Sequence, residues 1–173
     1  MKLTAFKHFG EKAEICIRSF SEQDTFAVAG KLAELLRSGD VLALRGQLGA
    51  GKTIFSKGLA KAIGVTSDVT SPTFTFVAEY TGAKFELYHF DLYRIDMPEQ
   101  LEDIGFDGYV FGKGISLIEW PEKAGRYLPQ DRLDITIERI SGDTQGRQIS
   151  MLGETQRYKS LLEEFEKIVD SCD

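Results

Sequence analysis

The hydrophobic positions along the chain change their spacing several times, which predicts strands and helices in succession. Residues 13–19 alternate between apolar and polar types, with Ile15 and Ile17 on one face, and this pattern predicts a short strand. Ser21 suits the N-cap of a following helix, because Asp24 completes a loose capping box with it. We expect that helix to end at Gly39, with its inward positions at Phe26, Ala29, Leu32, Ala33 and Leu36.

Two short apolar runs without alternation, 41–44 and 115–118, are typical of strands that are buried on both faces. Helices are therefore expected to cover both faces of the sheet. An amphipathic helix is predicted from about Lys52 to Ile63, and Gly64 suits the C′ position directly after it. The inward positions of this helix are expected to be Ile54, Phe55, Leu59, Ala62 and Ile63.

The second half of the chain predicts further strands and helices. Alternation is strict over residues 133–140, and residues 141–143, Ser-Gly-Asp, indicate a hairpin turn to a strand over 147–152. Strands are also expected at 73–80 and 84–91, joined through Thr81 and Gly82, with a short helix at 99–104. The helix that closes the chain carries apolar residues at Tyr158, Leu161, Leu162, Phe165 and Val169.

Composition limits where the protein acts. A chain of 173 residues suits a single domain over 1–173, with about 154–173 as an additional C-terminal helix. No apolar run approaches the ~20 residues that span a bilayer. The N-terminus also lacks the apolar stretch of a signal peptide. We therefore expect a cytoplasmic protein without a membrane partner.

Charge and the rarer residues exclude several other classes of site. The formal net charge is −6, whereas nucleic-acid-binding domains usually carry an excess of Lys and Arg. We therefore expect no DNA partner and only an indirect relation to RNA, through partner proteins or a small local patch. Cys16 and Cys172 form no C-x-x-C pair and are expected as free thiols. His8 and His89 are too few for a histidine-rich metal site.

One segment carries a specific chemical signal. Residues 46–53, Gly-Gln-Leu-Gly-Ala-Gly-Lys-Thr, match the phosphate-binding loop G-x-x-x-x-G-K-S/T in full. The loop stands between a predicted buried strand and an amphipathic helix, which is the context that such a loop requires. We therefore expect ATP and Mg²⁺ as cofactors. The predicted nucleotide-binding residues of the loop are Gln47, Leu48, Gly49, Ala50, Gly51, Lys52 and Thr53.

Each residue type in the loop has a physical reason. Glycines at 49 and 51 let backbone N–H groups turn toward phosphate oxygens without a Cβ clash. Lys52 adds a point charge for the β- and γ-phosphates, and the Thr53 hydroxyl is a ligand for Mg²⁺. The pattern as a whole predicts an α/β, three-layer P-loop NTPase-like fold with a mixed parallel and antiparallel sheet.

A phosphate-binding loop also needs carboxylates at the ends of neighbouring strands to organise Mg²⁺ and its waters. Asp91 and Glu119 each end a predicted strand and are the two candidates, although each could instead be a solvated terminal charge. The chain contains no Asn, so the N-K-x-D element that reads guanine in many GTPases is absent. ATP is therefore favoured over GTP.

Further motifs resemble one family. They are Gly39-Asp40-Val41 before the loop, then residues 71–75 (Ser-Pro-Thr-Phe-Thr), 89–94 (His-Phe-Asp-Leu-Tyr-Arg) and 118–122 (Ile-Glu-Trp-Pro-Glu). Their order and approximate spacing resemble those of the TsaE (YjeE) family over roughly residues 20–150. One departure is Gln47, where the family commonly has Asp. The final helix after about Glu154 lies outside the resemblance.

The resemblance implies an activity and partners. It implies an Mg-dependent, partner-stimulated ATPase that supports the TsaD–TsaB complex, which transfers threonylcarbamoyl to a tRNA adenosine next to the anticodon. The family's functional residues fall on this sequence as follows. Lys52 and Thr53 hold phosphate and Mg²⁺, Glu119 is the second magnesium-associated carboxylate, and Asp91 serves hydrolysis. Glu22 and Thr25 resemble the contact to the nucleotide's edge, and residues 71–75 resemble a nucleotide-sensing switch.

Other interpretations stay open on the sequence. A small-molecule P-loop kinase would need an Arg-rich lid, for which Arg126 and Arg132 form a weak candidate pair. A non-catalytic, nucleotide-gated assembly factor is a third possibility. Trp120 fits either core packing or shaping of the site, Pro72 suits entry to an edge strand, and His89 suits a buried, hydrogen-bonded position. Their roles are not fixed by the pattern.

Cations for catalysis are scarce near the predicted site. Arg45 precedes the loop and is expected to point along its strand, away from the γ-phosphate. Arg94 could reach the site only if the segment after Tyr93 folds over it, or it could pair with a surface acid or meet a partner protein. The sequence shows no other obvious cation. We therefore expect slow hydrolysis by the isolated chain and acceleration by a partner.

Overall fold

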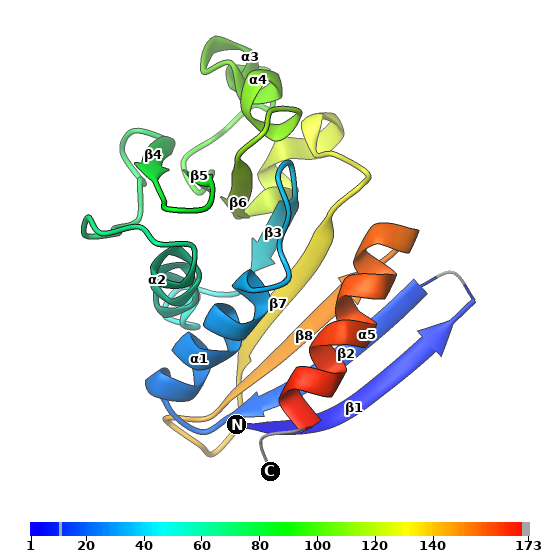
Figure 1. The fold of residues 1–173 in the computed structure, drawn as a ribbon. Coiled ribbons are helices and arrows are strands. Elements are labelled where there is room, and N and C mark those ends of the chain that lie inside the picture. The colour runs from blue at the N-terminus through cyan, green and yellow to red at the C-terminus, as the bar shows by residue number, and fades with distance from the viewer. Residues whose placement is uncertain (11, 171–173) are drawn as a thin grey trace.

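The computed structural model describes residues 1–10 and 12–170, and its elements are arranged around one mixed sheet of eight strands (Figure 1). Cys172, expected to be a free thiol, lies outside the described residues. The strands are β1 (Lys2–Phe9), β2 (Lys12–Ser19), β3 (Val41–Arg45), β4 (Val77–Thr81), β5 (Glu86–Asp91), β6 (Ile115–Glu119), β7 (Leu133–Arg139) and β8 (Arg147–Gly153). Their order in the sheet is β1-β2-β8-β7-β3-β6-β5-β4.

The sheet has a parallel centre and antiparallel borders. Strands β7, β3, β6 and β5 run parallel to one another, while β4 on one side and β8, β2 and β1 on the other are added antiparallel. Because parallel strands end at the same edge of a sheet, the central strands bring their carboxyl ends together. This confirms the predicted α/β fold with a mixed sheet.

Helices cover the two faces unequally. They are α1 (Glu22–Ala33), α2 (Lys52–Ala62), α3 (Gln100–Asp103), α4 (Phe106–Val110), α5 (Gln156–Asp170) and the 3₁₀ segment η1 (Pro121–Tyr127). Helices α1, α2 and α5 pack on one face, whereas α3, α4 and η1 pack on the other. Strand β6 is buried throughout and β3 is buried from Val41 to Leu44, as their unalternated apolar sequences predict.

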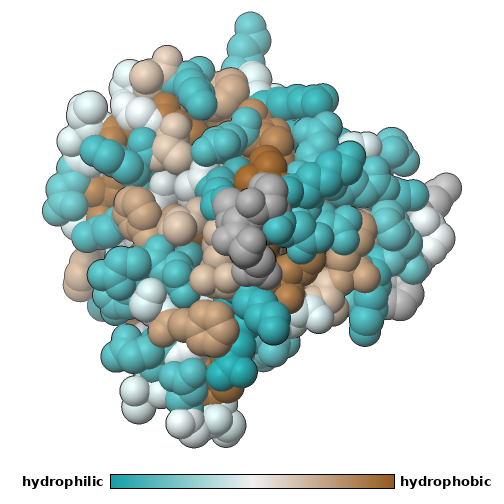
Figure 2. All heavy atoms as spheres, turned by 60° about the horizontal axis from the view of Figure 1, so that its bottom comes forward, coloured by the Kyte–Doolittle hydropathy of each residue, from teal (hydrophilic) through white to brown (hydrophobic). Residues whose placement is uncertain are grey.

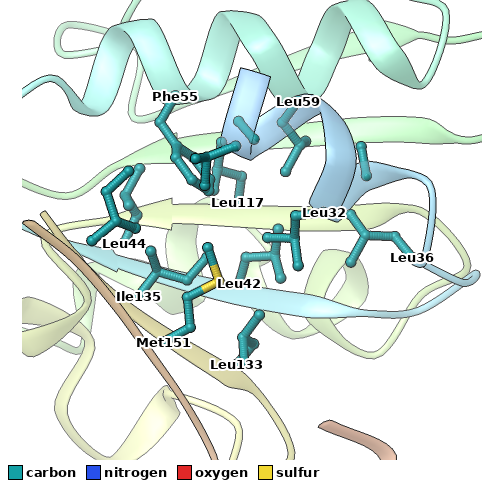
Figure 3. Close-up of a cluster of buried hydrophobic side chains, with 14 of the residues drawn as sticks. Leu32, Leu36, Leu42, Leu44, Phe55, Leu59, Leu117, Leu133, Ile135 and Met151 are labelled. Carbon is teal, nitrogen blue, oxygen red and sulfur yellow. The ribbon is translucent and has the colours of Figure 1, made fainter. Parts of the chain in front are cut away.

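The main core lies between α1, α2 and the sheet (Figure 3). Leucines on α1 and α2 point toward leucines on β3 and β6, and Met151 of β8 closes the cluster on the side of the antiparallel strands. The two helices approach closely because Gly58 of α2 has no Cβ, which would collide with the carbonyl oxygen of Phe26 in α1. The phosphate-loop helix is thus fixed against both the sheet and α1.

Helix α1 begins as predicted but differs in its end and in one inward position. Ser21 is the N-cap and accepts a hydrogen bond from the Asp24 N–H at 3.1 Å, while Asp24 accepts one from the N–H of Phe20 at 2.9 Å. The helix ends at Ala33, and two short turns at 34–35 and 38–39 lead to β3. Phe26, expected inward, is 38% exposed, because the approach of α2 at this point leaves room for backbone only.

Two strand predictions were wrong in extent, and one strand was not predicted. Residues 73–76 form a turn, so the strand expected over 73–80 begins only at Val77, and its partner begins at Glu86 instead of 84. Phe76 has a φ of 64°, which reverses the chain where an extended run was expected. Pro72 is buried in this turn and does not enter a strand. Strand β1 was missed because its polar residues show no clear alternation.

The surface is largely hydrophilic on the face that Figure 2 shows, with hydrophobic residues visible only in small separate areas. Among the described residues, no helix combines the length and the apolar character needed to cross a membrane. The exposed large hydrophobic side chains include three near the carboxyl ends of the central strands: Leu48, Phe74 and Tyr93.

Helix α5, the predicted C-terminal helix, is tied to the start of β3. The buried hydroxyl of Tyr158 accepts a hydrogen bond from the Val41 N–H at 2.8 Å. Arg157 next to it donates from Nε to Asp40 Oδ1 at 3.1 Å. Burial raises the pKa of Tyr158 well above its ordinary value, and the nearby Asp40 carboxylate adds to this shift. The strand that leads into the phosphate loop is therefore anchored from the C-terminal helix.

We predict that Tyr158→Phe lowers the free energy of unfolding by about 1–3 kcal/mol, because the buried Val41 N–H loses its acceptor. Urea unfolding followed by circular dichroism measures the change. Tyr80→Phe is the matched control, since the Tyr80 hydroxyl bonds the backbone of Thr70 in an exposed position. Equal losses in the two variants would contradict the anchoring role of Tyr158.

Candidate active site at the phosphate loop

The loop between β3 and α2 follows a backbone path that only glycine tolerates. Gly46, Gly49 and Gly51 have φ values of 151°, 74° and 113°. A Cβ on Gly46 would lie 2.7 Å from the Ile137 carbonyl oxygen. Strand β7 therefore backs the loop so closely that a side chain cannot enter. Conformation therefore favours glycine at all three positions, and at Gly46 the space requires it as well.

Lys52 lies at the start of α2 and is buried, with 6% of its surface exposed. Its Nζ donates to the carbonyl oxygens of Gly46 at 2.8 Å and of Gln47 at 3.3 Å, and lies 4.4 Å from the Trp120 ring centroid. Burial lowers the pKa of Lys52, while the nearby Glu119 and Asp91 carboxylates oppose that shift. The ammonium group is therefore placed inside the curve of the loop.

A cavity of about 440 Å³ opens beside the loop. It lies at the carboxyl ends of β3, β5 and β6, where ligands bind in open parallel sheets. Of the residues predicted from the sequence, Glu22, Leu48, Gly49, Gly51, Lys52, Thr53, Asp91 and Glu119 line this cavity. Thr25 and Trp120 line it as well.

Glu119 is held in place by two buried side chains. His89 Nε2 lies 2.9 Å from Glu119 Oε1, and the Ser56 hydroxyl, which shares its proton with the Lys52 carbonyl oxygen at 2.9 Å, lies 3.3 Å from the same carboxylate oxygen. His89 is fully buried, as the sequence predicted, and Glu119 is 3% exposed. Both contacts fall on Oε1, so Oε2 is the carboxylate oxygen left for the cavity. Ser56 was missed, although its place four residues after Lys52 puts it on the same helix face.

Asp91 connects the cavity to the segment before β4. The hydroxyls of Ser71 and Thr73 both donate to Asp91 Oδ2, the latter at 2.6 Å. The N–H of Tyr93 donates to the other carboxylate oxygen at 3.1 Å. Asp91 and Glu119 are register partners on the adjacent strands β5 and β6. The two predicted carboxylates therefore lie side by side, and the predicted switch segment is bonded to one of them.

These residues fit a nucleotide and a divalent cation. The loop backbone turns at three glycines, and a buried ammonium bonds two of the loop's carbonyl oxygens. Thr53 supplies an exposed hydroxyl, and the Glu119 and Asp91 carboxylates supply the hard oxygen ligands that Mg²⁺ prefers, directly or through water. A loop that binds only an anion would not need these carboxylates, so Asp91 and Glu119 favour a site that also takes a cation.

Two loop residues predicted to bind the nucleotide face elsewhere. Gln47 and Ala50 line a second cavity of about 540 Å³ on the other side of the loop, together with Trp120 and Glu122. The Gln47 and Ala50 side chains are therefore placed away from the first cavity, and any contact they make with nucleotide there would be through backbone.

The four arginines that the sequence analysis considered contact residues outside the cavity. Arg45 pairs with Asp134 on β7, which confirms that it points away from the cavity. Arg94 stacks on the exposed Phe74 ring at 4.2 Å. Arg126 pairs with Glu99 and Arg132 with Asp134, so neither of the two lid candidates lines the cavity.

The expectation that no other cation lies near the loop was wrong. Arg139 and Arg147, at the facing ends of β7 and β8, both reach the loop. Arg139 donates to the Gly49 carbonyl oxygen from Nε at 3.2 Å and from Nη2 at 3.0 Å. Arg147 Nε donates to the Ala50 carbonyl oxygen at 2.7 Å, and Arg147 lines the cavity. The sequence predicted the hairpin that carries these two arginines, but it gave no indication that the hairpin lies next to the loop.

Comparisons with known proteins agree with the motifs. The family model described as "Threonylcarbamoyl adenosine biosynthesis protein TsaE" matches residues 19–149. The Bacillus subtilis (strain 168) protein named "tRNA threonylcarbamoyladenosine biosynthesis protein TsaE" is 43% identical over 150 residues, covering 87% of this chain and 92% of that protein. The Aquifex aeolicus protein of the same name is 47% identical over 105 residues, covering 60% of this chain and 74% of that protein.

A solved structure is also similar. The crystal structure of YdiB from Bacillus subtilis superposes with a TM-score of 0.79 at 37% identity, covering 93% of this chain and 98% of that one. The similarity thus extends over the sheet as well as the motifs. The family model matches most of the chain, and the 43% identical relative is matched over 92% of its own length. The chain therefore belongs to the TsaE family.

Proposed function

We propose that this protein is an Mg-dependent ATPase that supports threonylcarbamoyl modification of the tRNA adenosine next to the anticodon, in the cytoplasm. The observation that carries the proposal is one cavity in which a buried phosphate-loop lysine meets two buried carboxylates on adjacent strands. Relatives named for threonylcarbamoyladenosine biosynthesis support the pathway. TsaD and TsaB are the proposed partners, and tRNA is involved only through them.

The residues divide the work of binding between them. Lys52, released from the Gly46 and Gln47 carbonyls, would bind phosphate oxygens, and the amides of the loop would surround the same anion. Thr53 and Glu119 would hold the cation, with His89 and Ser56 fixing the Glu119 carboxylate. Mg²⁺, when bound, neutralises phosphate charge and polarises the γ-phosphoryl group. Glu22 and Thr25 stand at the cavity wall formed by the start of α1.

Asp91 is assigned to hydrolysis through its position beside Glu119. A carboxylate there can orient an attacking water for in-line displacement. Its present partners, the Ser71 and Thr73 hydroxyls, lie in the segment proposed to sense the nucleotide. A change in the bonding of Asp91 would therefore be transmitted to that segment, which gives the segment a physical link to the state of the site.

We predict that Lys52→Ala weakens ATP binding about 10–100-fold without unfolding the protein, because a buried charge that binds phosphate is removed. Titration with a fluorescent ATP analogue measures the affinity. Lys57→Ala is the matched control, since Lys57 lies on the same helix, outside the residues that line the cavity, and only approaches Asp68 at 3.8 Å. Near-parental affinity of Lys52→Ala would overturn its assigned role.

We predict that Glu119→Gln and Asp91→Asn separate binding from turnover. Both changes keep the shape of the side chain and remove its charge. Glu119→Gln should require about tenfold more Mg²⁺ for half-maximal ATP binding, whereas Asp91→Asn should bind ATP and release phosphate at least about tenfold more slowly. The measurements are Mg²⁺ titrations of nucleotide binding and steady-state phosphate release.

Glu86→Gln controls for loss of a charge in the same strand as Asp91, because Glu86 is exposed at the far end of β5 and accepts from the Thr81 hydroxyl. It should behave as the parent. If Glu119→Gln and Asp91→Asn also behave as the parent, the two carboxylates are structural and the proposed catalytic assignment fails.

We predict that a TsaD–TsaB pair accelerates phosphate release by the chain at least about tenfold. An arginine supplied to the γ-phosphate is worth ~10³–10⁵ in rate in related enzymes. Arg45 and Arg94 are engaged outside the cavity, and Arg147 is bonded to a loop carbonyl. The test is steady-state phosphate release by the chain alone and with the pair from the same source. Equal rates would contradict partner-dependent hydrolysis.

A further inference from the structure

Two arginines face each other directly at the end of the β7–β8 hairpin. Arg139 and Arg147 are register partners in an antiparallel ladder, where like charges opposite one another are destabilising. No ion pair to either side chain is found among residues 1–10 and 12–170. A like-charge pair at this place therefore needs another stabilising partner.

That partner is the phosphate loop. The guanidinium of Arg139 donates twice to the Gly49 carbonyl oxygen, and that of Arg147 donates once to the carbonyl oxygen of the next residue, Ala50. Two further bonds join Arg147 Nη1 to the Thr144 and Gly146 carbonyl oxygens in its own hairpin, at 3.1 and 2.9 Å. Arg147 thus connects a tight turn of the hairpin to the loop.

The direction of the two carbonyl groups also determines the direction of the neighbouring N–H groups in the loop. In a trans peptide the C=O of one residue and the N–H of the next point in opposite directions. Holding the Gly49 and Ala50 carbonyls toward the hairpin aims the N–H groups of Ala50 and Gly51 away from it. The Ala50 N–H points away from the hairpin and donates to the Gln47 carbonyl oxygen at 3.0 Å, a bond that phosphate would have to replace. Lys52 Nζ donates to the same Gln47 carbonyl oxygen.

Gly49 is shaped to receive one of the arginines. A Cβ on Gly49 would lie 2.6 Å from Arg139 Nη2, so the guanidinium occupies the space that a side chain would fill. The hydrogen bonds of the two arginines to the loop differ in their exposure to solvent. Arg139 is exposed, whereas Arg147 is half-buried at the cavity wall and makes the shorter bond. Arg147 should therefore matter more than Arg139.

We propose that Arg139 and Arg147 are positioning residues that preset the phosphate-loop amides for nucleotide phosphates, so that the β7–β8 hairpin is part of the nucleotide site. The inference rests on the proposed ATP binding. Because the pair acts on the amides that surround the phosphates, its effect should grow with the number of phosphates on the ligand. It adds binding energy by preorganisation, as the loop amides need not be reoriented when the ligand arrives.

The experiment compares ATP and AMP binding by the full chain and its variants, using a fluorescent ATP analogue and its displacement. Arg147→Gln should weaken ATP binding about tenfold and Arg139→Gln about threefold, while AMP binding should change less than twofold. Arg147→Lys should recover part of the loss, because an ammonium can still donate one bond to the Ala50 carbonyl. Thermal unfolding of the nucleotide-free variants is measured in parallel.

Arg18→Gln is the matched control. Arg18 lies on β2 and contacts Asp143 in the same hairpin at 3.4 Å, without reaching the loop. It should leave ATP affinity unchanged. Equal losses for ATP and AMP, or losses that merely follow a fall in thermal stability, would assign the pair a structural role only and overturn the proposal. If the parent chain itself fails to bind ATP, the proposed function fails instead.

Discussion

The backbone path of the phosphate loop is the constraint on which the rest of this structure depends. Between β3 and α2 the chain passes through three glycines with positive φ, at positions 46, 49 and 51. Such a segment has few side-chain contacts of its own and gains no rigidity from its glycines. Its shape must therefore be imposed from outside, by the elements that pack around it.

The surrounding elements each supply part of that support. Strand β3 is buried on both faces, and its first residue is tied to Tyr158 of α5. Helix α2 is pressed against α1 at Gly58. Strand β7 places the Ile137 carbonyl against Gly46, and the arginines of the β7–β8 hairpin bond the next part of the loop. Strand β7 and the β7–β8 hairpin thus support the loop from the side of the antiparallel strands.

Sequence reasoning succeeded where local pattern and local structure coincide. The buried strands, the phosphate loop, α2 and the hairpin to β8 follow from apolar runs, glycine positions and strict alternation. Strand ends also placed Asp91 and Glu119 correctly, because carboxyl ends of parallel strands meet at one edge. In each case a short stretch of chain contains all of the information that the prediction used.

It failed where the structure depends on contacts between distant segments. Residues 73–76 have β-forming side chains, yet Ser71 and Thr73 turn toward Asp91 and the chain reverses at Phe76. Phe26 follows the helical period but is displaced outward by the close approach of Gly58. Arg139 and Arg147 lie about 90 or more residues beyond the loop that they contact. The two partners of each of these contacts are too far apart in the sequence for a local pattern to include both.

The net charge of −6 is the least informative of the sequence properties about the site itself. Three cationic side chains, from Lys52, Arg139 and Arg147, bond carbonyl oxygens of the loop, and within the part of the chain that the structure describes none of them forms an ion pair. A carboxylate partner would cancel the positive charge, whereas a carbonyl oxygen orients the cation and leaves its charge uncompensated. The loop therefore gathers three cationic side chains in a protein whose net charge is negative. The Asp91 and Glu119 carboxylates line the same cavity as Lys52, so positive and negative groups face one space.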